Sequence, residues 1–329
     1  MTGVQTCALP ILLKQFDSFG RGISSGSKLP SVATLLSDIN RIWDASLKSK
    51  DLVVLETSST YIKEKGMNFL VRLLKSDGLK KKGSNIKSPQ AAIADPFDYA
   101  TLNRNLLVHT FENHVLLLNK FPVMKNHCVL VTKSFKSQCS PLTQDDFEAV
   151  TSILSQIPSL VFYNCGVDSG ASQSHKHIQL IPYDSFENEK TPFDEFMEGK
   201  PVPSNAMCQC PLYLFDHVLY PISSSSDPHE LYQHYSEMVE HMTKVRQSEG
   251  KKMESYNFLL FKKWLMLVPR TRETWNSINV NSLGFTGSFL VKKEETLEAL
   301  KKTGLLYVLN HVVDRSEERR VGKECRSRW

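Results

Sequence analysis

Residues 164–182 read NCGVDSGASQSHKHIQLIP, a turn-rich run followed by an alternating run. The alternating run, from His175 to Ile181, predicts a β-strand whose successive side chains point to opposite faces. One face of this strand would carry His175, His177 and Gln179. The other face would carry Lys176, Ile178 and Leu180. The strand is therefore expected to be polar on one face and largely apolar on the other.

The polar face suits phosphate chemistry because of the loop that precedes it. The glycine- and serine-rich run up to Ser174 offers backbone N–H groups that can cradle phosphate oxygens. A neutral imidazole can attack phosphorus as a nucleophile. Two histidines at positions i and i+2 are also compatible with an ordinary polar strand face, or with half of a metal site. Composition and spacing leave these three interpretations open.

The segment GASQSHKHIQ (170–179) resembles the H-x-H-x-Q transferase branch of the histidine-triad superfamily, and more narrowly the diadenosine tetraphosphate phosphorylase (ATP adenylyltransferase) family. The resemblance implies that His177 is the nucleophile and forms a nucleotidyl-imidazole intermediate, while His175 orients its neighbours or the phosphate. Gln179 stands where the hydrolase branch has a third histidine. Because a carboxamide is not a general acid near neutral pH, the intermediate is expected to wait for an anionic acceptor such as inorganic phosphate.

Two further segments carry the same resemblance. HVLLLNKFPVMKNHCVLVT (114–132) is similar to the central hairpin of the family, and NSLGFTGSFLVK (281–292) is similar to its second signature. By this similarity Asn119 would bind a hydroxyl or a phosphate, Lys120 a phosphate, and Asn164 the region of the sugar. The substrate-binding residues implied in this way are Lys82 (chosen from the triplet Lys80, Lys81, Lys82), Asn119, Lys120, Asn164, Gly170, Ala171, Ser172, Gln173, Asn281, Ser282, Leu283 and Lys292.

Periodicity predicts the main helices and strands. Apolar residues recur at helical spacing over 35–47 and 231–245, and Thr143 is expected to cap a third helix. Strands are predicted at 67–74, 114–122, 126–132, 159–163, 256–261 and 264–270. His114 and His127 are interpreted as structural. The family resemblance implies an α+β fold, a histidine-triad-like antiparallel sheet flanked by helices, with a C-terminal α+β region completing the site.

The two ends of the chain are set apart from this reasoning. Residues 1–11 and 315–329 resemble translated sequencing adapters, which places a histidine-triad-like catalytic region at 12–198 and an ATP adenylyltransferase C-terminal region at 199–314. The whole chain has a formal net charge of +5, and without 315–329 there remain 34 basic and 32 acidic residues, a net charge of +2. A charge this small argues against a nucleic-acid polymer as partner.

Cysteine usage indicates a reducing compartment, and a cytoplasmic location is expected. Between the two ends stand five scattered cysteines, an odd number that does not form a disulfide framework: Cys128, Cys139, Cys165, Cys208 and Cys210. The last two form a pair too isolated to indicate zinc. No apolar run approaches the length of a membrane span. We expect no resident metal and no required cofactor, with magnesium only as a companion of the nucleotide.

The reaction that the resemblance implies is the phosphorolysis of diadenosine tetraphosphate to ATP and ADP, so the expected partners are small nucleotides and inorganic phosphate. A GDP-sugar phosphorylase is a close alternative. A hexose-1-phosphate uridylyltransferase shares H-x-H-x-Q but typically has H-P-H-G-Q, whereas this chain has Lys176 and Ile178 at the variable positions. An alternative of another class is a non-catalytic nucleotide-binding protein. Base preference and oligomeric state stay open.

Overall fold

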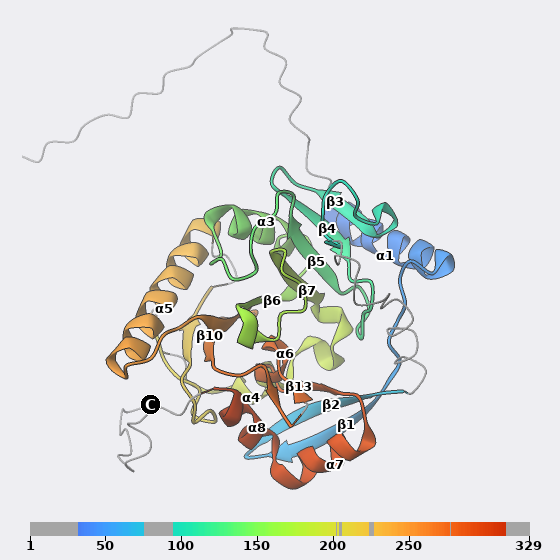
Figure 1. Ribbon diagram of the computed structural model, residues 1–329. Helices are drawn as coiled ribbons and strands as arrows, with labels where there is room; N and C mark the ends of the chain where they lie inside the picture. The colour runs from blue at the N-terminus through green and yellow to red at the C-terminus, as the bar shows by residue number, and fades with distance from the viewer. Residues whose placement is uncertain are drawn as a thin grey trace, which may run out of the picture. The chain divides into compact units, whose positions relative to one another are not determined.

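An eight-stranded sheet holds the strand of the two-histidine motif near its middle (Figure 1). Every pairing in this sheet is antiparallel. In spatial order the strands are β3 (Leu107–Thr110), β4 (His114–Leu118), β5 (Cys128–Thr132), β7 (His177–Pro182), β6 (Ser159–Cys165), β9 (Ser255–Leu260), β10 (Trp264–Arg270) and β8 (Val218–Pro221). The computed structural model describes residues 32–75, 95–201, 203, 206–223, 227–276 and 278–313. The β6–β9 pairing joins the two halves of the chain in one sheet.

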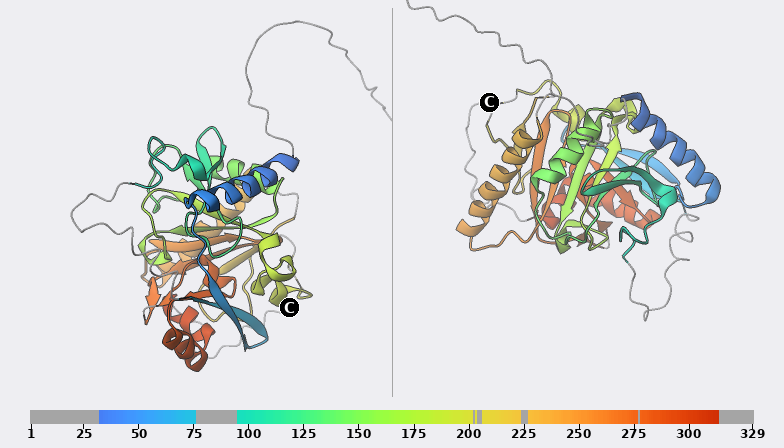
Figure 2. Two further views of the ribbon diagram at one scale, coloured as in Figure 1. Left: turned by 90° about the vertical axis from the view of Figure 1, so that its right-hand side faces the viewer. Right: turned by 90° about the horizontal axis from the view of Figure 1, so that it is seen from above.

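Amphipathic helices cover one face of this sheet (Figure 1, Figure 2), namely α1 (Val32–Ser49), α3 (Gln144–Leu154) and α5 (Pro228–Ser248). Their apolar stripes pack on strand residues such as Leu130 and Ile178. α3 begins after Thr143 because Asp146 accepts hydrogen bonds from the backbone N–H and the hydroxyl of Thr143, as in a capping box. The predicted cap at Thr143 is therefore confirmed.

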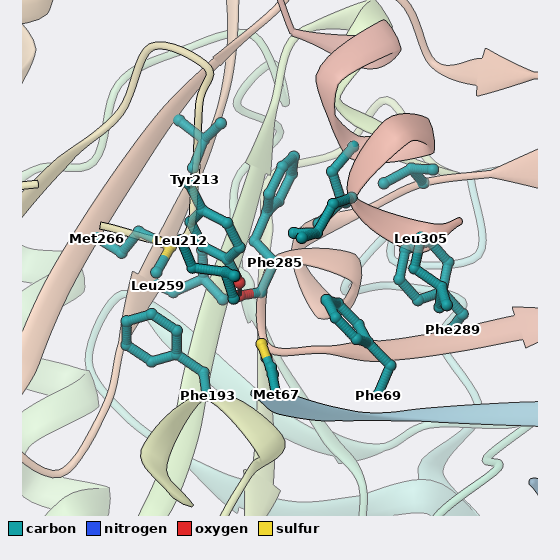
Figure 3. Close-up of a cluster of buried hydrophobic side chains, with 14 of the residues drawn as sticks. Met67, Phe69, Phe193, Leu212, Tyr213, Leu259, Met266, Phe285, Phe289 and Leu305 are labelled. Carbon is teal, nitrogen blue, oxygen red and sulfur yellow. Dashed lines mark hydrogen bonds between the residues drawn. The ribbon is translucent and has the colours of Figure 1, made fainter. Parts of the chain in front are cut away.

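The opposite face, which the two histidines share, is covered in part by a second sheet and by helices from the C-terminal half (Figure 1). This three-stranded sheet consists of β1 (Thr57–Glu64), β2 (Met67–Leu74) and β13 (Ser288–Val291). The helices are α4 (Pro192–Met197), α6 (Ser282–Phe285), α7 (Glu294–Thr303) and α8 (Leu305–Val312), and a short hairpin of β11 (Thr274–Trp275) and β12 (Ile278–Asn279) precedes α6. Figure 3 shows side chains of these elements packed with Leu259 and Met266 of the large sheet: Met67, Phe69, Phe193, Phe285, Phe289 and Leu305.

A strip of polar side chains divides the apolar residues on this face into two clusters. One cluster consists of Val115, Leu117, Val129 and Val131, with Leu102, Phe97, Tyr99 and Leu107. The other is the large cluster of Figure 3. His177 lies next to the first cluster, because it pairs with Val131 of that cluster on the neighbouring strand β5. Gln179 pairs with Val129 on one side and with Phe162, of the large cluster, on the other.

The predicted α+β architecture is confirmed, and the strands predicted at 67–74, 114–122 and 126–132 appear as β2, β4 and β5. β4 ends four residues earlier than predicted, at Leu118, and both β5 and β7 begin two residues later than predicted. β7 begins at His177, and His175 forms an isolated bridge to Ser137, outside the named strands. Before His177 the backbone pairs with residues 136–138: the Lys176 N–H donates to the carbonyl oxygen of Lys136, and the Gln138 N–H donates to that of Ser174. Within the described ranges, none of the helices combines the length and hydropathy that a membrane span requires.

Candidate active site

The ring of His177 is held in one orientation by its own strand. Its Nδ1 lies 2.8 Å from the carbonyl oxygen of His175, so Nδ1 carries the proton and donates. Nε2 is then the nitrogen with the lone pair. Burial lowers the pKa of the ring, which is 3% exposed, although the hydrogen bond to His175 acts in the opposite direction. His177 is therefore neutral at physiological pH, with a nucleophilic Nε2.

His175 differs from His177 in that both of its ring nitrogens have protein partners. Nδ1 lies 2.6 Å from Oδ2 of Asp95. Nε2 lies 2.8 Å from the carbonyl oxygen of Thr132 and 3.1 Å from the hydroxyl of the same residue. These contacts make His175 a support of the strand and leave His177 as the candidate nucleophile. Asp95, which sequence reasoning missed, holds His175 from outside the sheet.

A chain of hydrogen bonds determines which end of the Gln179 amide faces the site. Asn119 Oδ1 accepts from the backbone N–H of Phe121 at 3.0 Å, so Nδ2 is the end that lies 3.3 Å from His127 Nδ1. His127 must then carry its proton on Nε2, which lies 3.0 Å from Oε1 of Gln179. Burial lowers the pKa of His127 to about 4, which keeps this ring neutral. The NH2 group of Gln179 is therefore the end that can donate to a substrate oxygen.

The carboxamide of Asn164 ties the second sequence signature to the large sheet. Its Oδ1 accepts from the Ser282 backbone N–H at 3.1 Å, from the Ser282 hydroxyl at 2.7 Å and from Asn257 Nδ2 at 2.8 Å. Asn281 caps α6, since its Oδ1 accepts from the N–H of Leu283. The structure thus brings Asn164, Asn281 and Ser282 together across 118 positions of sequence. Contact of Asn164 with a sugar stays a prediction.

Arg270 and Asn257 lie beneath this junction, and sequence reasoning missed both. Arg270 Nη1 donates to Asn257 Oδ1 at 2.6 Å and to the carbonyl oxygen of Ser169 at 3.3 Å. Burial lowers the pKa of Arg270 to about 9, so the guanidinium stays charged at neutral pH. The carboxylates of Asp168, in the loop, and Glu273 act electrostatically on this cation and compensate its charge in part. The sequence indicates these two residues, Asn257 and Arg270, only weakly. Asn257 is a polar residue inside the apolar run of β9, and Arg270 is the last residue of β10.

The loop between β6 and the histidines contacts the α6 cap at Gly170. This residue has φ +82°, in the left-handed region, and an added Cβ would lie 2.9 Å from the carbonyl oxygen of Val280 and 3.0 Å from Cβ of Asn281. Glycine is therefore required by both the conformation and the close approach. The predicted phosphate loop, residues 170–173, begins in contact with the predicted nucleotide-binding segment at Asn281.

Gly170→Ala is expected to destabilise the protein more than Gly250→Ala. Gly250 has φ +70° but no atom within 4 Å of an added Cβ, so it isolates the cost of the backbone conformation. That conformation costs alanine about 1–2 kcal/mol, and the crowding at Gly170 adds about 1–3 kcal/mol. Urea unfolding of the two variants measures the difference. Equal losses of unfolding free energy in the two variants would show that a Cβ at residue 170 is not crowded by Val280 and Asn281.

The predicted substrate-binding lysines lie at exposed positions or outside the described residues. Lys120 follows β4 and is exposed, with Nζ 5.6 Å from the ring centroid of Phe121. Lys292 is exposed directly after β13 of the three-stranded sheet. Lys82 lies outside the described residues. Contact of each with a nucleotide stays a prediction.

A buried cluster of ionisable side chains lies behind the histidines, on the helix-covered face. Lys176 Nζ lies 2.5 Å from Asp146 Oδ2 and 2.8 Å from the carbonyl oxygen of Pro141. His114 Nε2 lies 2.8 Å from Asp146 Oδ1. Burial by itself would raise the pKa of Asp146, but the hydrogen bond from His114 and the charge of Lys176 outweigh it and hold that pKa well below its ordinary value. α3, interpreted from the sequence as packing, thus also anchors the histidine strand.

Three of the four ring nitrogens of the two histidines have protein partners. Both ring nitrogens of His175 and Nδ1 of His177 are taken by protein partners. In the part of the chain that the structure describes, no group of three or more His, Cys, Asp or Glu side chains is placed to hold a metal ion. The arrangement can instead present a neutral imidazole, a carboxamide donor and a glycine-rich loop to a phosphoanhydride.

Comparison with known proteins finds the same architecture and sequence pattern elsewhere. The family model for the Ap4A phosphorylase N-terminal domain matches residues 26–199, and that for the ATP adenylyltransferase C-terminal domain matches residues 211–313. Diadenosine 5',5'''-P1,P4-tetraphosphate phosphorylase 2 of Saccharomyces cerevisiae is 32% identical over 272 residues, 74% of this chain and 78% of the relative. Protein APA1 of the same yeast is 26% identical over 291 residues, 82% and 89% of the two chains. The crystal structure of yeast Ap4A phosphorylase Apa2 in complex with Ap4A gives a TM-score of 0.71 at 30% identity, covering 85% of this chain and 97% of that one.

Proposed function

Because the chain belongs to the Ap4A phosphorylase family, we propose that it cleaves diadenosine tetraphosphate (Ap4A) with inorganic phosphate to give ATP and ADP. The observation that carries the proposal is the neutral, buried imidazole of His177, with Nδ1 held and Nε2 bearing the lone pair, next to a glycine-rich loop. The activity in the name of the yeast relative and the Ap4A in the Apa2 crystal support the substrate.

In the first step, Nε2 of His177 attacks the phosphorus atom next to one adenosine. The Nε2–P bond forms, the phosphoanhydride P–O bond breaks, and ATP leaves. Positive charge develops on the ring as the bond forms, so the hydrogen bond from Nδ1 to the carbonyl of His175 strengthens. In this proposal the NH2 group of Gln179 and the N–H groups of the loop hold the phosphate oxygens. The product on the enzyme is AMP bonded to His177.

In the second step, an oxygen of inorganic phosphate attacks the same phosphorus. The new P–O bond forms, the Nε2–P bond breaks, and ADP leaves while His177 returns to its neutral form. A phosphate dianion needs no base to activate it, whereas water does. Gln179, whose oxygen is held by His127, cannot act as that base near neutral pH. Transfer to phosphate is therefore expected to outpace hydrolysis.

The experiment that tests the proposal is incubation of the protein with Ap4A, with and without inorganic phosphate, followed by separation of the nucleotides. Equal amounts of ATP and ADP, formed only with phosphate, are expected. AMP in place of ADP would indicate a hydrolase. No turnover by a protein shown to be folded would overturn the substrate and direct attention to GDP-sugars.

The pH dependence of the first step is expected to follow the ring of His177. Burial lowers its pKa below the ordinary value of about 6.5. Protonation removes the Nε2 lone pair, so the rate should be constant above that pH and fall only in more acidic solution. Single-turnover release of ATP without phosphate measures this step and avoids the titration of inorganic phosphate. A rate that already falls between pH 8 and pH 7 would contradict a lowered pKa.

A further inference from the structure

The hydrogen-bond ladder between β6 and β7 stops two residues short of His177. Its last pair is Phe162 with Gln179, and in that register Asn164 would pair with His177. The side chain of Gln138 fills the gap instead. Its Oε1 accepts from the N–H of His177 at 2.8 Å, and its Nε2 donates to the carbonyl oxygens of Asn164 at 2.7 Å and His177 at 3.2 Å. A carboxamide offers the same kinds of donor and acceptor as a peptide group, so Gln138 replaces strand backbone here.

The backbone of Gln138 is tied to the same loop. Its N–H donates to the carbonyl oxygen of Ser174 at 2.8 Å. Its carbonyl oxygen accepts from the hydroxyl of Tyr163 at 2.9 Å and from the N–H of Gly166 at 3.3 Å. One residue therefore holds both ends of the glycine- and serine-rich loop, where β6 ends and where the histidines begin. With 3% of its surface exposed, Gln138 makes these contacts with little competition from water.

The orientation of the His177 ring depends on the backbone that Gln138 holds. The ring's Nδ1 donates to the carbonyl of His175, two residues away, so any shift of the backbone between them moves Nε2. Without the Gln138 side chain, the N–H and C=O of His177 would be buried without those partners, which drives the segment to rearrange. A displacement of about 1 Å at a reacting group costs about 100-fold in rate.

We propose that Gln138 is a positioning residue of the reaction, which sets the approach of His177 to phosphorus and the separation of the two ends of the glycine- and serine-rich loop. The kinetic part of this inference rests on the proposed function. Gln138 lies 39 positions before His177 and outside every motif that identified the site. It acts through the backbone of His177 and not through contact with the reacting atoms.

Gln138→Met tests the proposal because it keeps the length of the side chain and removes its three hydrogen bonds. We expect kcat to fall about 100-fold while KM stays within about threefold of the wild-type value. The matched control is Gln156→Met, at a position shortly before β6 begins and at the end of that strand away from the histidines. This substitution removes a hydrogen bond to the carbonyl oxygen of Ser152 and should leave kcat at the wild-type value. A rise in KM with no fall in kcat, or an equal fall of kcat in Gln156→Met, would overturn the proposal.

Two measurements that do not need turnover separate this inference from the proposed function. Nitrogen-15 NMR of histidine-labelled protein is expected to show His177 as the Nδ1–H tautomer in the wild type and as a mixture in Gln138→Met, with the signal assigned by its loss in His177→Ala. The His177 amide of the wild type is expected to exchange slowly with deuterium. One outcome would separate the two proposals: the wild type shows the Nδ1–H tautomer and slow amide exchange, Gln138→Met shows the mixture, and the wild type does not cleave Ap4A. That outcome would refute the proposed substrate and support the role of Gln138 in holding His177. An unchanged tautomer in Gln138→Met, or fast amide exchange in the wild type, would refute the role of Gln138.

Discussion

His177→Ala is expected to lower the rate of Ap4A phosphorolysis by about 10⁴-fold or more, as removal of a nucleophile does in other enzymes. The substitution removes the Nε2 lone pair that attacks phosphorus. The other imidazole of the motif cannot replace it, because His175 has both ring nitrogens held by Asp95 and Thr132. Phosphate would have to displace ATP from Ap4A directly. Formation of ADP from labelled Ap4A measures the loss.

The covalent intermediate provides a second readout of the same variant. Wild-type protein given Ap4A labelled in the adenylyl group, without phosphate, is expected to retain label through an acid-labile N–P bond, and His177→Ala is expected to retain none. His229→Ala changes an exposed histidine on α5 and should behave as the wild type. Label on His177→Ala, or turnover within tenfold of the wild type, would show that another group attacks phosphorus.

Asp146→Asn is expected to lower the free energy of unfolding by about 3–5 kcal/mol, the cost of leaving a buried charge without its partner. The side chains of Asp146 and Lys176 are 2% and 1% exposed, and their charged atoms lie 2.5 Å apart. Asparagine keeps the shape of the aspartate but removes the charge that compensates Lys176. Because Lys176 stands between His175 and His177, activity is expected to fall as well. Chemical denaturation measures the change in stability.

An exposed ion pair supplies the control for Asp146→Asn. Glu240 pairs with Lys244 on the outer surface of α5, so Glu240→Gln is expected to change stability far less.

The pH dependence of the stabilisation by Asp146 has a definite sign, because the folded protein depresses the pKa of this residue. The stabilisation is present above the unfolded pKa of about 3.9 and is lost as the pH falls below it. The difference between wild type and variant should therefore narrow in acid. A difference that stays constant would contradict the buried ion pair.

Much of the fold follows from local patterns in the sequence. Alternation over 175–181 predicted that Gln179 and Ile178 face opposite sides of the sheet, and the structure places Ile178 among the helix-covered residues and Gln179 in the polar strip. Helical spacing over 35–47 and 231–245 likewise corresponds to α1 and α5. These predictions succeed because the periods of strand and helix are properties of the backbone that each short segment already has.

The supports of the candidate site were less accessible to such reasoning. The sequence indicates a structural role for His127, and the structure makes it the group that orients Gln179. No sequence motif points to Asp95 or Arg270, although they hold His175 and the loop. Each of these residues is an ordinary polar side chain in its own segment. Its role comes from a partner that lies 52 to 101 positions away.

The sequence by itself determined which segments are strands and helices, which strand carries the imidazoles, and the family to which its motifs point. Only the tertiary structure decided the state of each reactive group. It determines which nitrogen of His177 is free to attack, which end of Gln179 donates, and that the side chain of Gln138 replaces the backbone partner of His177. The physical reason is the nature of the hydrogen bond. A donor needs an acceptor within about 3 Å and in line with its proton, and strand order determines which distant residue lies there.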